Sequence, residues 1–209
     1  MSATTTPSER FWEPHYQNVE QSWGTRPNAV LAAVINDLST VPARALELGC
    51  GHGGDALWLA SKDWQVTAVD VSATAVARVT ETAQRGGLGE RVTAIQQDLA
   101  NGLLAGPFEL VYASYFHTPV VIDRDAIIGR AAGLLAPHGF LVVVDHASSA
   151  PWSWGDPSQT FPSAHETLTG FGCGEGLRVV RAETTWREAT GPGGQRAKVA
   201  DNIMVAQRM

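Results

Sequence analysis

Short apolar runs alternate with amphipathic segments over the first two thirds of the chain. The apolar runs predict buried strands at about 43–48, 65–69, 91–96, 107–113 and 140–144. The segments between them predict helices at 55–62, 72–85 and 125–135, the second capped by Ser72. Strands that alternate with helices indicate a parallel sheet with right-handed crossovers.

The C-terminal part breaks this alternation. Residues 148–162 are rich in Trp, Pro, Gly and Ser, and a helix or lid is predicted at 164–171. Two strands at 177–190 and 197–207 flank a glycine-rich turn, a pattern typical of a hairpin. The last strand is therefore predicted to be antiparallel.

The N-terminal segments precede the first strand and are additions to this pattern. Residues 1–10 are polar and predicted to be flexible, and helices are predicted at about 11–22 and 29–38. The expected organisation is one domain at 11–209, with a cap at 11–40 and a lid or substrate loop at 148–172. The fold class is α/β: a Rossmann-like, doubly wound, seven-stranded and mostly parallel sheet with helices on both faces.

The stretch around the first predicted strand carries the main chemical signal. Glu47 begins a Glu-x-Gly-x-Gly-x-Gly loop, and Asp70 ends the second strand 21 residues after Gly49. Glycines let a ligand approach the backbone, and an acid at the tip of the second strand can bind both hydroxyls of a ribose. The layout predicts a nucleotide-type pocket.

Two ligand classes use such a pocket. Gly49-x-Gly51-x-x-Gly54 satisfies the dinucleotide fingerprint, with Asp70 at the expected offset. However, Glu47 and Asp55 place carboxylates beside the loop, where they would repel a pyrophosphate. This favours a ligand without a diphosphate.

On these residues the sequence resembles the class I S-adenosylmethionine-dependent methyltransferases. The segment Phe11-Trp12-x-x-x-Tyr16 and the Trp-Gly-x-x-Pro-Asn segment at 23–28 look like the cap of the tellurite-resistance and thiopurine branch. The resemblance implies S-adenosylmethionine as cofactor, S-adenosylhomocysteine as product, and a ribose contact from Asp70. The cofactor contacts that it implies or that the strand ends suggest are Trp23, Arg26, Glu47, Gly49, Cys50, Gly51, Gly53, Asp55, Asp70, Val71, Ser72, Asp98, Leu99, Ser114 and Tyr115.

Methyl transfer needs an acceptor held in line with the methyl group and a base that takes its proton. His117, just after the fourth strand, is the first candidate for the base, since imidazole titrates near neutral pH. His146, after the fifth strand, and His15, in the cap, are the alternatives. Asp145-His146 lacks an evident third ligand, so no metal is expected.

Composition narrows the acceptor. The 209 residues carry a net charge of −6, which argues against a nucleic-acid partner. Two cysteines, no signal segment and no membrane-length apolar run predict a soluble cytoplasmic protein. Tryptophans at 12, 152 and 154 in the predicted cap and lid fit a closed pocket for a small, flat or apolar acceptor.

The sequence therefore favours methyl transfer to a small aromatic or heterocyclic acceptor at O, N or C. Two other functions remain open. One is a nicotinamide-dependent oxidoreductase, suggested by the dinucleotide fingerprint. The other is a non-catalytic S-adenosylmethionine sensor, suggested by the lack of an unambiguous base.

Overall fold

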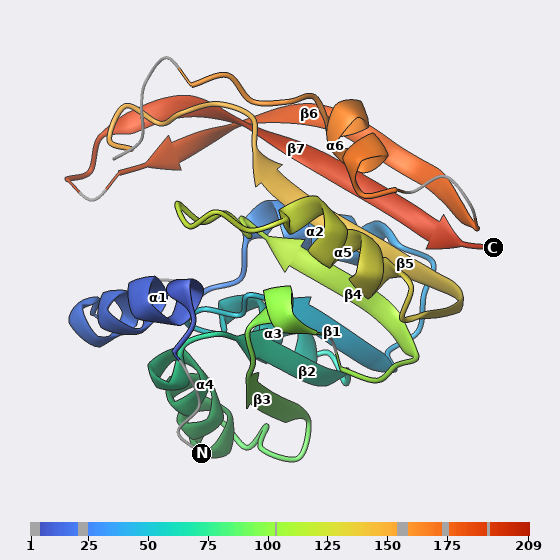
Figure 1. Ribbon diagram of the computed structural model, residues 1–209. Helices are drawn as coiled ribbons and strands as arrows, with labels where there is room; N and C mark the ends of the chain where they lie inside the picture. Colours follow the sequence, from blue (N-terminus) through green and yellow to red (C-terminus); the bar gives the residue numbers. More distant parts are fainter. Residues whose placement is uncertain (1–4, 21–24, 103, 154–158, 173–175, 192) are drawn as a thin grey trace.

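A computed structural model describes residues 5–20, 25–102, 104–153, 159–172, 176–191 and 193–209 (Figure 1). Its strands form one seven-stranded sheet in the order β3-β2-β1-β4-β5-β7-β6. The strands are β1 (Arg44–Leu48), β2 (Gln65–Asp70), β3 (Val92–Gln96), β4 (Phe108–Ser114), β5 (Leu135–His146), β6 (Leu177–Thr190) and β7 (Arg196–Arg208). The first five pair in parallel, and β7 pairs antiparallel with both β5 and β6. The predicted fold class is confirmed.

Helices cover both faces of the sheet. One core contains side chains of α2 (Ala29–Asp37), α3 (Gly54–Ala60) and α4 (Ala73–Arg85), and the other contains those of α5 (Arg124–Ala132) and α6 (Ala164–Gly170). A short helix, η1 (Leu99–Asn101), follows β3, and α1 (Pro7–Asn18) precedes the sheet. In Figure 1, α1 lies beyond the end of the sheet to which the β4 arrow points. That end is where ligands bind in open parallel sheets.

Two helix starts follow from side-chain caps. Ser72 accepts a hydrogen bond from Ala75 N and caps α4, as predicted. At α1, Thr6 accepts from Glu9 N, so the helix begins at Pro7 and not at Phe11. Residues 7–10 therefore belong to the cap helix and not to the expected flexible N-terminus.

The junction of α5 and β5 differs from the prediction. The helix ends at Ala132 rather than at 135, and β5 begins at Leu135 rather than at 140. The cause is a strand pair, Phe108 with Leu135, that precedes a bulge in the β4–β5 ladder. A Cβ at Gly139 would lie 3.0–3.1 Å from backbone oxygens, so glycine permits this close approach.

The described residues of the predicted lid lie beside the C-terminal hairpin. Helix α6 packs against β6 and β7, and the ring of Trp152 packs against Gly191 at the hairpin turn. Among the residues described between 148 and 172, none lines the pocket introduced below. The described residues of this segment therefore contact the hairpin and not the pocket.

Candidate active site

The glycine loop is shaped around Asp70. Three glycines of the loop, Gly49, Gly51 and Gly53, have positive φ. Residues with a side chain rarely adopt this backbone conformation. Gly51 N donates to Asp70 Oδ2 and Ser72 N to Asp70 Oδ1, each at 2.9 Å. Burial raises the pKa of Asp70, and these hydrogen bonds oppose the rise. The carboxylate is thus fixed at the strand end, with lone pairs left for a ligand.

Acidic and polar groups lie beneath the loop. Glu47 is 3% exposed, and neither its Oε2 nor the hydroxyl of the adjacent Tyr112 meets a hydrogen-bond partner among the described residues. Burial, and then the charge of Asp55, raise the pKa of Glu47 well above its usual value, and the neighbouring Tyr112 hydroxyl opposes the rise. A cation bound nearby would stabilise its ionised form.

Asp55 has a structural partner. Asn28 N donates to Asp55 Oδ1 at 2.6 Å, while the Asn28 side chain caps α2 and donates to Ser114 Oγ at 2.7 Å. Burial raises the pKa of Asp55, and hydrogen bonds from Asn28 and Ser114 oppose the rise. Asp55 and Ser114 thus tie the start of α2 to the glycine loop.

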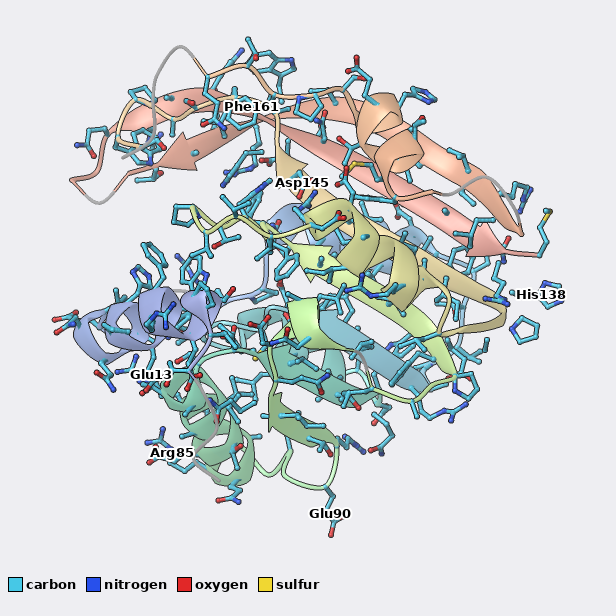
Figure 2. The ribbon with its side chains drawn as sticks, in the orientation of Figure 1. Glu13, Arg85, Glu90, His138, Asp145 and Phe161 are labelled. Atoms are coloured by element: carbon cyan, nitrogen blue, oxygen red, sulfur yellow. The ribbon has the colours of Figure 1, made fainter. Side chains whose placement is uncertain are left out.

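Helix α1 forms one wall of the site through three side chains. Glu13 accepts from Ser72 Oγ at 2.6 Å and from the backbone N and hydroxyl of Thr74, at the start of α4 (Figure 2). Although partial burial opposes it, these bonds lower the pKa of Glu13 to about 2. Tyr16 covers Gly51, where an added Cβ would lie 2.9 Å from its hydroxyl, and Trp12 Nε1 donates to Thr118 Oγ1 at 3.1 Å. Helix α1 is therefore hydrogen-bonded both to the start of α4 and to the segment that follows β4.

A pocket lies between α1 and the strand ends. It is lined by Ser8, Trp12, Tyr16, Gly49, Asp70, Val71, Gln97, Asp98, Leu99, Ala100, Tyr115, Phe116, His117, Thr118, Ile122 and Ile127. Asp98 caps η1 by accepting from Ala100 N at 2.9 Å. Of the predicted cofactor contacts, the lining contains Gly49, Asp70, Val71, Asp98, Leu99 and Tyr115.

His117 reaches the pocket with a buried acid behind it. Its Nε2 lies 3.4 Å from Asp145 Oδ1, and Asp145 accepts two hydrogen bonds from Arg124 Nη2, at 2.6 and 2.7 Å. Figure 2 places Asp145 at the end of β5. Burial lowers the pKa of His117, helped by Arg124 and His146 and opposed by Asp145. These shifts favour neutral imidazole near pH 7.

His146 lies outside the pocket lining, between two other rings. It stacks on Tyr115 with centroids 3.9 Å apart and on His117 at 5.8 Å. The Tyr115 hydroxyl donates to Asp201 at 3.0 Å and accepts from Arg187 Nη2 at 2.9 Å. Sequence reasoning missed Arg124, Arg187 and Asp201, because they are 7 to 84 residues from His117 along the chain and belong to no motif.

The remaining predicted residues have other surroundings. His15 and Arg26 are exposed and do not line the pocket, and Trp23 lies outside the described residues. Cys50 is buried in the core, Gly53 packs against Val79, and Ser72 holds Asp70 from behind the pocket. Across the described ranges no group of three or more His, Cys, Asp or Glu side chains is arranged to hold a metal.

Comparison with known proteins shows a methyltransferase domain within the chain. Residues 45–139 match the family model described as "Methyltransferase domain". Over 144 residues the chain is 47% identical to "Ribosomal RNA small subunit methyltransferase C" of Alcanivorax borkumensis, covering 68% of this chain and 42% of that protein. It is 27% identical to "Thiocyanate methyltransferase 1" of Arabidopsis thaliana, covering 70% and 68%. The chain thus spans less than half of the first relative.

Solved structures share the fold. NodS, an N-methyltransferase of Bradyrhizobium japonicum in complex with S-adenosylhomocysteine, superposes with a TM-score of 0.69 at 18% identity, covering 97% of this chain and 99% of that one. TehB of Haemophilus influenzae gives 0.65 at 18% identity, covering 97% and 67%.

The seven-stranded sheet is that of the class I methyltransferase fold. Residues 45–139 form a methyltransferase domain, the chain has the class I methyltransferase fold, and S-adenosylmethionine is the cofactor that such domains use. The residues present fit this cofactor: Asp70 lines the pocket with both carboxylate oxygens held by backbone N–H groups, and Oε2 of Glu47 is buried without a hydrogen-bond partner among the described residues. Among the described residues no helix is long and apolar enough to cross a membrane.

Proposed function

We propose that the chain transfers the methyl group of S-adenosylmethionine to a small acceptor, aromatic or heterocyclic, with His117 as the base. The observation that supports this most is the position of His117: it shares one pocket with Asp70 and Asp98, and Asp145 lies behind it. Aromatic side chains of Trp12, Tyr16 and Phe116 line the same pocket and suit a flat acceptor.

The chemistry asks little of the protein beyond orientation and proton removal. The acceptor's lone pair forms the bond to the methyl carbon as the carbon–sulfur bond breaks, and the acceptor's proton passes to a neutral nitrogen of His117. Asp145 faces Nε2, which favours a proton there and leaves Nδ1 as the accepting atom. Arg124 holds Asp145 in place through hydrogen bonds to both of its carboxylate oxygens.

The test compares His117→Ala with the unchanged protein, using a labelled cofactor and a panel of phenols, indoles and amines. General base catalysis contributes roughly 100- to 10,000-fold, so kcat should fall by about 100-fold or more. The dissociation constant of S-adenosylhomocysteine should stay within about 3-fold, because the ribose contact is elsewhere. A wild-type rate in this variant would exclude His117 as the base.

The Arabidopsis relative supports a second candidate, a sulfur anion as acceptor. Thiocyanate carries no proton, so its methylation needs no base, whereas a phenol or a neutral thiol does. If thiocyanate is the acceptor, His117→Ala will leave its turnover nearly unchanged. Binding of S-adenosylhomocysteine without transfer to any acceptor in the panel would favour the sensor function instead.

A further inference from the structure

The C-terminal hairpin of β6 and β7 reaches the pocket wall through one hydrogen-bonded group. Asp201, on β7, is fully buried, and Arg187, on β6, donates from Nε to Asp201 Oδ2. Arg187 also donates from Nη2 to the Tyr115 hydroxyl at 2.9 Å, and that hydroxyl donates to Asp201 Oδ1 at 3.0 Å. Three side chains from three strand regions thus close a ring of hydrogen bonds.

Tyr115 needs such support. Its φ is +51°, a left-handed conformation that is strained for a non-glycine residue and persists only where the surrounding structure enforces it. Its backbone N donates to Val144 O at 2.8 Å, and its hydroxyl is fixed by the hairpin. This conformation follows directly after β4 and sets the course of the chain through Phe116 to His117.

The rings continue this support to the base. Tyr115 stacks on His146 with an interplanar angle of 13°, and His146 stacks on His117 with an angle of 16°. His146 Nδ1 also lies 3.7 Å from Asp201 Oδ1. The rings of Tyr115, His146 and His117 thus form one stacked column. Tyr115, at the end away from His117, is hydrogen-bonded to the hairpin, so the hairpin helps to fix the orientation of the His117 ring.

We propose that Arg187 and Asp201 are positioning residues of this enzyme, acting through Tyr115 and His146 on the orientation of His117. The inference rests on the proposed function of His117 as the base. It gives the hairpin a role in turnover in addition to its place in the sheet. The orientation of His117 matters for the rate, because a misplacement of a reacting group by about 1 Å can cost on the order of 100-fold in rate.

The experiment uses the full chain with Arg187→Gln and Tyr115→Phe, each of which removes hydrogen bonds and keeps most of the side-chain volume. Arg178→Gln is the matched control: Arg178 lies on the same strand and donates to Gln207, at the exposed end of the hairpin. We measure kcat and KM for an acceptor that carries a proton, the dissociation constant of S-adenosylhomocysteine, and the imidazole carbon–proton NMR signals of His117 and His146.

We expect kcat to fall at least about 10-fold in Arg187→Gln and Tyr115→Phe, with the imidazole signals of both histidines shifted. Arg187 does not line the pocket, so KM and the affinity for S-adenosylhomocysteine should change less than about 3-fold in Arg187→Gln. Arg178→Gln should resemble the unchanged protein in every measurement.

The proposal is overturned if both variants fold and keep the kcat of the unchanged protein, or if their histidine signals do not move. It is also overturned if the loss appears only in KM, since that would indicate weaker acceptor binding. If the unchanged protein transfers no methyl group at all, the proposed function fails, and the NMR signals alone then decide whether the hairpin fixes the rings.

Discussion

At the scale of single residues, the site depends on acids that the fold holds in place at a cost. Asp70 is the clearest, since backbone N–H groups orient both of its oxygens toward one geometry. Replacing it with alanine should weaken S-adenosylhomocysteine binding by about 10- to 100-fold, because a hydrogen bond to a charged group contributes roughly 1.5–3 kcal/mol. Isothermal titration calorimetry checks this. An affinity within 2- to 3-fold of the unchanged protein would contradict the ribose contact.

Replacing Glu47 should stabilise the free protein, although it should weaken cofactor binding. Its pKa is higher in the folded state than in the unfolded chain, so folding favours its protonated form and the stabilising effect is lost as pH rises above about 4.5. Glu47→Gln should therefore raise the melting temperature of the free protein at pH 7 and less so at pH 4.5, while it weakens cofactor binding. Each kcal/mol corresponds to roughly 2–4 °C for a chain of this size. A lower melting temperature at pH 7 would mean that Glu47 supports the fold.

At the scale of elements, α1 is held to the rest of the site by Glu13. Its carboxylate occupies the start of α4, where N–H groups and the helix dipole favour a negative charge. Glu13→Gln should increase the dissociation rate of S-adenosylhomocysteine about 3- to 10-fold, because Trp12 and Tyr16 would cover the pocket less often.

The control for this prediction is Glu81→Gln. Glu81 lies on α4 with an exposed side chain and pairs only at 3.8 Å with Arg85. Stopped-flow release of the ligand measures both variants. Equal release rates would show that α1 is not fixed by Glu13.

Periodicity located the strands of the sheet and the final hairpin, because each buries a continuous apolar face or brackets a glycine turn. The predicted boundaries of α5 and β5 were wrong, because the strand bulge there depends on pairing with β4 and not on the local sequence pattern. The glycine loop and Asp70 were predictable because their spacing is local. Arg187 and Asp201 were not, because only the antiparallel return of β7 beside β5 brings them to Tyr115.

At the scale of the whole molecule, two separate groups of elements serve the proposed binding and the proposed turnover. The glycine loop, Asp70 and α1 surround the proposed cofactor site, whereas the hairpin, α5 and β5 contact the stacked rings of Tyr115, His146 and His117 on the side proposed for the acceptor. Figure 1 shows the hairpin and α1 on different sides of the β4 end. Changes in one group should therefore alter affinity, and changes in the other should alter rate.

The most direct test of the central claim is the choice of ligand by the unchanged protein. The claim is that a nucleoside without a diphosphate binds over the glycine loop with its ribose at Asp70. At 100 times its dissociation constant a ligand stabilises by about 2.7 kcal/mol, which corresponds to roughly 5–10 °C here. Thermal unfolding with S-adenosylhomocysteine should show such a rise, and NAD should show none. A rise with NAD and none with S-adenosylhomocysteine would contradict the account.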